Sequence, residues 1–321
     1  MTSPALGPGA EFDIIRAIAR KLGAAAGPLA DDCALIPDGA TTLALSTDVS
    51  VENVHFRRDW LEAHEIGWRA AAGALADLAA EGAEVIGVLA AVTAPKSAAE
   101  RDLVELMRGV GEAAAAVRGT VLGGDLSSGP LWGITITVLG RAARPVTRAG
   151  ARPGDGLWVT GTLGGARAAL EAWLRGDQPD PDARTAFARP MPRIEAGAWL
   201  AAHGATAMLD LSDGLAGDAR HLAAASGVQL TVELADLPVA RAVVAEAERL
   251  RVTPVAFAAQ GGEDYELLVT LPAGFASAEA EAFRRATGLG LTRIGAAAAG
   301  AGVRLLLGQD EVALAGFDHF R

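Results

Sequence analysis

One short stretch, residues 209–218, most narrowly limits how this chain can fold. It reads Leu-Asp-Leu-Ser-Asp-Gly-Leu-Ala-Gly-Asp and follows an apolar lead-in at 205–211. The lead-in predicts a strand, Gly214 predicts a turn, and the apolar residues after it recur at helical spacing. Asp210 and Ser212 would share one face of the strand, because side chains alternate with a period of two. Asp213 at the turn is either a helix cap or part of a site, and this stretch alone favours neither interpretation.

Carboxylates at the ends of apolar runs recur along the chain, and Asp77 adds one to an apolar helical stretch at 70–80. An isolated acid on such a face is costly to bury. Carboxylates at strand ends gather at one rim of an open sheet, and several like charges held together repel unless a cation neutralises them. The acids at strand ends are Asp31, Asp32, Asp48, Asp125, Asp210, Asp213, Glu263 and Asp264.

These ligands offer only oxygen, which favours Mg²⁺ or Ca²⁺ over zinc, and the spacing of a calcium-binding EF-hand is absent. Glycines beside the acids, at 123–124, 214 and 261–262, let backbone N–H groups approach an anion. The phosphate-binding motif G-x-x-x-x-G-K-[ST] and the protein-kinase motifs H-R-D and D-F-G are absent. The pattern predicts Mg²⁺-dependent chemistry on a phosphorylated substrate. The residues leave one alternative open, in which the acids are caps and turns on a solvated rim.

The length of 321 residues suggests about two domains, and strand and helix patterns alternate in both halves. We therefore predict an α/β fold with α+β-like layering. The Pro- and Gly-rich segment 144–155 is the candidate hinge, which predicts domains at 1–145 and 146–321. The Pro- and Asp-rich segment 176–193 predicts a loop, and 265–271 predicts a strand.

Composition excludes several classes of protein. Lys and Arg total 28 against 39 Asp and Glu, a net charge of −11, and without a basic run this argues against a nucleic-acid partner. No window reaches the roughly 18 apolar residues of a membrane span, and residues 1–9 lack the pattern of a signal peptide. The single cysteine, Cys33, excludes an internal disulfide and fits a reducing cytoplasm, where we expect it to be a buried, inert residue.

Several segments carry a more specific pattern, in one order over nearly the whole chain. They read Asp31-Asp32-Cys33-Ala34, Leu45-Ser-Thr-Asp48, His55-Phe56, Ala76-Asp77-Leu78-Ala79, Gly123-Gly-Asp125, Thr147-Arg148-Ala-Gly-Ala151, Leu211-Ser-Asp-Gly-Leu215, Gly261-Gly-Glu-Asp-Tyr-Glu266 and Gly316-Phe-Asp-His-Phe320. Together they resemble the thiamine-monophosphate kinase family, which is related to aminoimidazole ribonucleotide synthetase and selenophosphate synthetase. The resemblance implies ATP- and Mg²⁺-dependent formation of thiamine diphosphate from thiamine monophosphate, the final step in making that cofactor. It also implies a homodimer formed through the sheet of an N-terminal ATP-binding domain, followed by a C-terminal α/β domain.

The resemblance also implies roles for individual residues. ATP would contact Gly124, Asp125, Arg148 and Ser212, with Arg148 as a phosphate clamp. Thiamine monophosphate would contact His55, Glu263 and Phe317. Two positions depart from the family pattern: Ala30, where a glycine is usual, and Leu314, where some members have Trp. Several Mg²⁺ ions would be held by Asp32, Ser46, Thr47, Asp48, Asp77, Asp125, Asp210 and Asp213.

Some features stay open at this point. We assign no general base, because a phosphate acceptor is largely ionised near neutral pH, and the sequence does not show whether a monovalent cation is needed. The turn Gly161–Gly165 could cradle a phosphate at a helix N-terminus or be a plain tight turn. We expect His64, His203 and His221 to be surface or packing residues.

Overall fold

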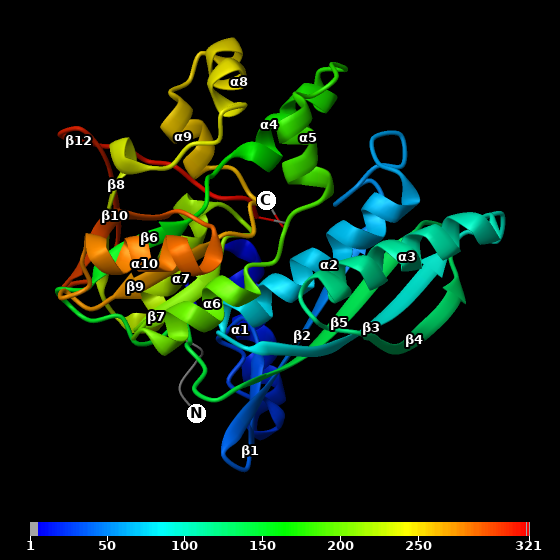
Figure 1. Cartoon of the computed structure of the whole chain (residues 1–321), viewed down its shortest axis with the longest axis horizontal. Helices are drawn as coiled ribbons and strands as arrows, with labels where there is room; N and C mark the ends of the chain where they lie inside the picture. The colour runs from blue at the N-terminus through cyan, green and yellow to red at the C-terminus, as the bar shows by residue number, and fades with distance from the viewer. Residues whose placement is uncertain (1–5, 319, 321) are drawn as a thin grey trace.

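The computed structural model describes residues 6–318 and 320, which form two sheets covered by helices (Figure 1). The first sheet has the order β1-β2-β5-β3-β4, and only β3 and β4 pair in parallel. Its strands are β1 (Ala34–Asp38), β2 (Thr41–Val51), β3 (Glu84–Ala94), β4 (Val121–Ser128) and β5 (Gly133–Ala142). This sheet lies within the first half of the chain.

The second sheet has the order β12-β11-β8-β10-β6-β9-β7, and only β11 and β8 pair in parallel. The predicted fold class, layered α/β halves with mixed sheets, is confirmed. The 145/146 domain boundary stays a proposal; it lies between the last strand of one sheet and the first of the other. The strands are β6 (Gly156–Thr160), β7 (Ala207–Asp210), β8 (Gln229–Glu233), β9 (Leu267–Leu271), β10 (Leu291–Ala298), β11 (Gly302–Leu307) and β12 (Asp310–Glu311).

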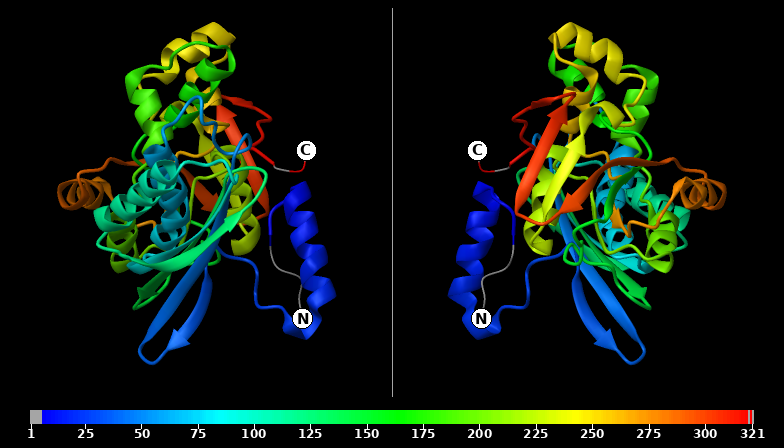
Figure 2. Two further views of the ribbon diagram at one scale, coloured as in Figure 1. Left: turned by 90° about the vertical axis from the view of Figure 1, so that its right-hand side faces the viewer. Right: turned by 90° about the vertical axis from the view of Figure 1, so that its left-hand side faces the viewer.

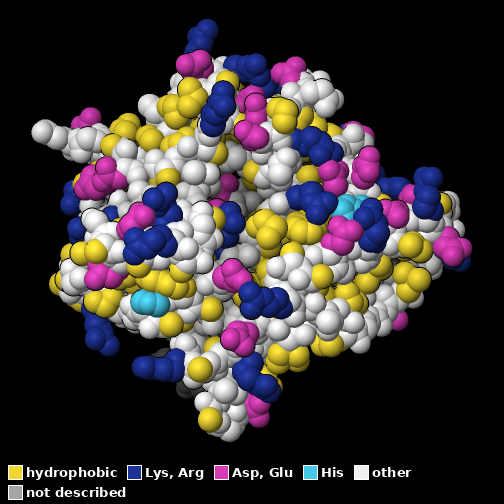
Figure 3. Space-filling model, in the orientation of Figure 1, with side chains coloured by type: hydrophobic (Ala, Val, Ile, Leu, Met, Phe, Trp, Pro, Cys, Tyr) yellow, Lys and Arg dark blue, Asp and Glu magenta, His cyan; other side chains and the backbone are white. Residues whose placement is uncertain are grey.

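The helices cover the sheets and join the halves. The α-helices are α1 (Ala10–Leu22), α2 (Ala63–Ala80), α3 (Glu100–Ala116), α4 (Gly165–Leu174), α5 (Pro181–Ala188), α6 (Ile194–Ala202), α7 (Leu215–Ser226), α8 (Val243–Leu250), α9 (Pro254–Ala259) and α10 (Ser277–Thr287). Short 3₁₀ turns lie at η1 (Gly23–Ala25) and η2 (Leu234–Asp236). No helix among the described residues is long and apolar enough to cross a membrane. On the face seen in Figure 3, basic side chains are interspersed with acidic ones.

The first sheet buries only one of its faces. Along β5, Ile134, Ile136 and Val138 are fully buried, whereas the residues between them are only half-buried. Helices α2 and α3 lie side by side over the buried face (Figure 1). The opposite face carries exposed apolar side chains, including Val49 and Leu89. This alternation is the period-two pattern of a sheet that is covered on one side.

Helix α2 is clamped by close backbone contacts. A Cβ at Gly67 would lie 1.9 Å from the carbonyl oxygen of Leu106 on α3, and a Cβ at Gly109 would lie 1.9 Å from that of His64. On its other side, a Cβ at Gly197 of α6 would lie 2.0 Å from the carbonyl oxygen of Ala79. These glycines therefore let helices from both halves approach α2, and the buried core is continuous across the two halves.

Two predicted elements differ from the structure. The predicted loop 176–193 contains α5, because the Asp180 side chain accepts hydrogen bonds from the backbone N–H groups of residues 182 and 183 and Pro181 opens the first turn. The strand predicted from 265 begins only at Leu267, because Glu263 and Tyr265 adopt φ of 65° and 50°, which no strand accommodates.

Helix α1 stands apart from the two sheets (Figure 2). None of its residues is fully buried. Its first residue is tied to the C-terminal tail, since the backbone N–H of Ala10 donates to Asp318 Oδ2 at 2.8 Å. Phe12 lies against the imidazole of His221 in α7, with ring centroids 3.9 Å apart and the ring planes tilted by 33°. Through these contacts, α1 packs against the second half of the chain.

Candidate active site

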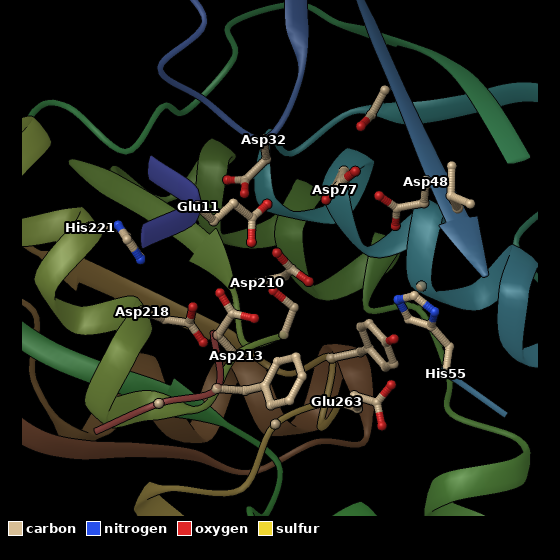
Figure 4. A pocket seen from close by; sticks show the side chains of 18 of the residues that line it. Glu11, Asp32, Asp48, His55, Asp77, Asp210, Asp213, Asp218, His221 and Glu263 are labelled. Atoms are coloured by element: carbon tan, nitrogen blue, oxygen red, sulfur yellow. The ribbon is translucent and has the colours of Figure 1, made fainter. Parts of the chain in front are cut away.

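A cavity of about 780 Å³ lies between the two halves and is lined by segments from the whole length of the chain. Figure 4 shows carboxylates entering it from several elements. Asp48 comes from β2, Asp77 from α2 and Asp210 from the end of β7, while Asp32 precedes β1. Asp213 enters from the turn before α7. Acids that are far apart in the sequence therefore meet in one place, although Asp48 lies within β2 and not at its end as predicted, because β2 continues to Val51.

The centre of this group is a triad of acids. One carboxylate oxygen each of Asp32, Asp77 and Asp210 lies within 4.8 Å of the other two, a spacing that a metal ion can bridge. Burial and the neighbouring carboxylates raise the pKa values of Asp77 and Asp210 well above their usual 3.8. Burial and the charge of Asp32 raise the pKa of Asp48 to about 6. The metal-free cluster thus disfavours its own charge, which a bound cation would reverse.

Oxygen donors surround the triad without completing its hydrogen bonds. Oδ2 of Asp32 is buried and has no hydrogen-bond partner among the described residues. The hydroxyl of Ser46 bonds to Asp77. The side chain of Thr47 is instead exposed on the opposite face of the sheet, where its Oγ1 lies 2.9 Å from Thr137 Oγ1. A set of oxygens with an unsatisfied buried carboxylate fits Mg²⁺.

Arg148 lies beside these acids. Its guanidinium binds Asp32 Oδ1, with Nε at 3.1 Å, and its backbone N–H donates to Asp31 Oδ1 at 3.0 Å. Burial and the Asp32 charge raise the pKa of Asp31 to about 6, against the lowering effect of these Arg148 contacts. The arginine therefore places a fixed positive charge at the edge of the metal-binding acids.

The residues assigned to the substrate also line the cavity. His55 Nδ1 accepts a hydrogen bond from the backbone N–H of Val51 at 3.1 Å. Glu263 forms an ion pair with Arg69 of α2, and its backbone N–H donates to the carbonyl of Ser212 at 2.7 Å. Phe317 is 58% exposed, and its backbone N–H donates to the Asp213 carbonyl at 2.9 Å. Ser212 lines the same cavity.

Gly124 and Asp125 lie elsewhere in the chain. They belong to β4, the edge strand of the first sheet, and they are not among the residues that line the cavity. Asp125 pairs with Ala91 of β3, which pairs with Thr135 of β5, which pairs with Val49 of β2. Three strand spacings of about 4.8 Å put Asp125 roughly 14 Å from β2. Within one chain, Asp125 and Asp48 therefore cannot share an ion.

The turn Gly161–Gly165 is occupied by the protein's own carboxylates. The backbone N–H of Gly164, at the start of α4, donates to both oxygens of Asp264, at 3.0 and 2.8 Å. A Cβ at Gly161 would lie 1.9 Å from Oε1 of the buried Glu266. Of the two alternatives, the structure favours a tight turn capped by Asp264 over a phosphate cradle.

Sequence reasoning missed several residues of the site. Glu81, at the end of α2, is fully buried, and burial with the charges of Asp31 and Asp32 raises its pKa to about 10. Asp218 and His221 of α7 are buried in the cavity wall; burial raises the pKa of Asp218 and lowers that of His221 to about 3. The available signal was the spacing of three between Asp218 and His221, which puts them on one helix face.

Comparisons with known proteins identify the family of the chain. Residues 30–142 match the N-terminal domain, and residues 152–308 the C-terminal domain, of AIR synthase related proteins. Thiamine-monophosphate kinase of Mycobacterium tuberculosis (strain ATCC 25618 / H37Rv) is 35% identical over 284 residues, 85% of each chain. That of Escherichia coli (strain K12) is 37% identical over 254 residues, 76% of each chain.

Solved structures show the same relationship. The structure of AaThiL complexed with AMPPCP and TMP matches with a TM-score of 0.87 and 31% identity, covering 97% of each chain. The hydrogenase maturation protein HypE in complex with ATP matches with a TM-score of 0.72 over 85% of this chain and 84% of that one. Its 20% identity shows a common fold alone. The motifs, the two matched domains and these relatives show that the chain belongs to the thiamine-monophosphate kinase family of AIR synthase related proteins.

Proposed function

We propose that this protein transfers the γ-phosphoryl group of ATP to thiamine monophosphate, giving thiamine diphosphate and ADP. The observation that carries the proposal is the convergence of Asp32, Asp77 and Asp210 beside Arg148 in one cavity. The names of the relatives and the ligands of the AaThiL structure support the choice of substrates.

The reaction requires positioning more than covalent chemistry. A phosphate oxygen of thiamine monophosphate forms a bond to the γ-phosphorus. The bond from that phosphorus to the β–γ bridging oxygen breaks, and its electron pair leaves with ADP. The acceptor is already ionised, so no side chain needs to remove a proton. Arg148 would bind phosphate through its guanidinium, and Ser212 would contact the nucleotide.

Mg²⁺ ions, when bound, neutralise the charge that develops on the phosphate oxygens. The donors that would hold them within one chain are all oxygens: Asp32, Ser46, Thr47, Asp48, Asp77, Asp210 and Asp213. His55, Glu263 and Phe317, which line the same cavity, would contact thiamine monophosphate. A role for a monovalent cation stays unassigned.

We propose that a second copy of the chain supplies Gly124 and Asp125. The open face of the first sheet carries Thr47, Val49 and Leu89, and Val49 lies in the same cross-strand row as Asp125. If two such faces pack together, the apolar side chains are covered and Asp125 of one copy reaches the Thr47 edge of the other. The homodimer would thereby complete each metal site.

Mixing two inactive variants tests this arrangement. An Asp125→Asn chain and an Asp77→Asn chain, unfolded together and refolded, form mixed dimers in which one of two sites is intact. Half of the dimers are mixed, so about a quarter of wild-type activity should return. If Asp125 served its own chain, both sites of a mixed dimer would be defective and no activity would return.

Incubation with ATP, Mg²⁺ and thiamine monophosphate tests the proposed reaction directly. We expect thiamine diphosphate and ADP in equal amounts. ADP formation only with another acceptor would indicate a different ATP-using member of the superfamily. Divalent-cation binding without turnover of any acceptor would indicate a non-catalytic metal-binding protein.

The enzyme is proposed to act in the reducing cytoplasm, which agrees with its one cysteine, Cys33, being buried and free.

A further inference from the structure

A second group of potential metal ligands lines the cavity, beside the acids described above. It consists of Asp213, at the turn before α7, and Asp218 and His221, one turn apart on α7. One ligand atom of each residue lies within 4.8 Å of the ligand atoms of the other two. Figure 4 shows the Asp218 carboxylate next to that of Asp213, with His221 on the same side of the pocket.

Two of these side chains are buried without satisfying their polar atoms. Asp218 is 4% exposed and His221 is 6% exposed. Oδ2 of Asp218 and Nδ1 of His221 have no hydrogen-bond partner among the described residues. Buried polar atoms normally have a partner, because leaving them unpaired is costly. A ligand on the Asp218 side would supply the contact that Oδ2 of Asp218 lacks.

Surrounding contacts hold the imidazole in place. Phe12 of α1 lies against the His221 ring, and a Cβ at Gly7 would lie 2.5 Å from His221 Nδ1. The N-terminal segment therefore covers His221 from outside, and Arg16 holds that segment by donating to the Gly7 carbonyl at 3.0 Å. A ligand of the imidazole must accordingly reach it from the Asp218 side, within the cavity.

The donor set distinguishes this site from the neighbouring acids. Asp32, Asp77 and Asp210 offer oxygen only, which suits Mg²⁺, whereas imidazole nitrogen suits transition metals. We propose that Asp213, which is also among the proposed Mg²⁺ donors, joins Asp218 and His221 in a further divalent-metal site that prefers a first-row transition ion to Mg²⁺. Three protein ligands leave coordination positions open to water or to a phosphate oxygen. The site does not depend on the proposed phosphoryl transfer, since its ligands are all present before any substrate binds.

Co²⁺ binding to metal-stripped, full-length protein tests the proposal. A titration in excess Mg²⁺, which fills the oxygen-only sites, is followed by calorimetry and by visible Co²⁺ absorption. We expect one Co²⁺ per chain. His221→Gln and Asp218→Asn should each lower the affinity by about tenfold or more. His55→Gln, which changes another histidine of the same cavity, is the matched control and should keep wild-type affinity.

A spectroscopic measurement on the wild-type chain tests the coordination by His221 directly. Mn²⁺ bound in excess Mg²⁺ should show electron spin-echo modulation from a directly coordinated ¹⁴N nucleus, and His221→Gln should abolish it. Absence of ¹⁴N coupling in the wild type, no Co²⁺ binding in Mg²⁺, or equal loss of affinity in His55→Gln and His221→Gln would each overturn the proposal.

Discussion

Arg69 is expected to position Glu263 for the substrate, and Arg69→Met tests that role. The guanidinium is nearly buried on α2 and forms an ion pair with Glu263, whose side chain is 28% exposed. It also lies 3.7 Å from the centre of the Phe187 ring and donates to the Phe187 carbonyl at 2.5 Å. Arg69 thus joins the first half of the chain to a loop whose Glu263 has a positive φ of 65°. Such a conformation persists only when its surroundings hold it.

The size of the effect follows from these contacts. Hydrogen bonds to charged groups contribute about 1.5–3 kcal/mol to the free energy of unfolding. Because Glu263 is partly exposed, we expect its ion pair with Arg69 to contribute only about 1–2 kcal/mol. The unpaired Phe187 carbonyl adds about 1–2 kcal/mol, so the free energy of unfolding should fall by about 2–4 kcal/mol. If the ion-pair energy is needed to hold Glu263 for substrate, KM for thiamine monophosphate should rise about tenfold.

Urea denaturation and steady-state kinetics at saturating ATP measure the two effects. Arg189→Met is the matched control, because Arg189 stacks on Trp68 at 4.1 Å and contacts α2 without being paired to Glu263. Glu263→Gln should raise KM by a similar factor, and the double variant should add little to either single change. The reasoning is refuted if Arg69→Met lowers stability but leaves KM for thiamine monophosphate at the value of the Arg189→Met protein.

Two further predictions concern pH and a helix cap. Protonation of Asp31, Asp48, Asp77 and Asp210 is favoured in the folded, metal-free protein, so this stability is present below their usual pKa of 3.8. It is lost as pH rises through the folded-state pKa, which is about 6 for Asp31 and Asp48 and well above 3.8 for Asp77 and Asp210. In EDTA, Tm should therefore be lower at pH 8 than at pH 5.5, and saturating Mg²⁺ should remove the difference; a Tm in EDTA that rises over this range would contradict it. Asp264→Ala should lower the free energy of unfolding by about 1–2 kcal/mol through loss of the α4 cap, whereas Asp264→Asn, which keeps an acceptor for Gly164, should cost less. Equal urea midpoints for these two variants would exclude the capping role.

Local patterns were sufficient to predict the centre of the site. Short apolar runs locate β2 and β7, and the acid that follows each run, Asp48 or Asp210, enters the cavity. Asp77 was recognisable because a lone carboxylate on an apolar helix requires a partner. These inferences depend only on the spacing of residues within one element.

The rest of the site depends on how elements dock, which spacing does not encode. Asp218 and His221 lie on a helix whose pattern resembles an ordinary solvated face, and they are buried only because α1 and the cavity wall surround them. The position of Asp125 depends on the strand order, since β4 follows β3 at the sheet edge and not β2. Gly67 and Gly109 were hidden among 39 glycines, and only the helix contact gives them a role.

The clamp on α2 also limits how the cavity can open. Because α3 and α6 approach the backbone of α2 too closely for a side chain to intervene, the helix that carries Asp77 cannot tilt without separating both contacts. Rotation of one half against the other about residues 143–155 is therefore opposed, despite the Pro- and Gly-rich sequence there. Ligands would then enter and leave through movement of the peripheral segments, which are α1, the 260–265 loop and the C-terminal tail. The metal-binding acids would keep their positions during turnover. The rate of turnover would then be limited by movement of these segments and not by closure of the two halves.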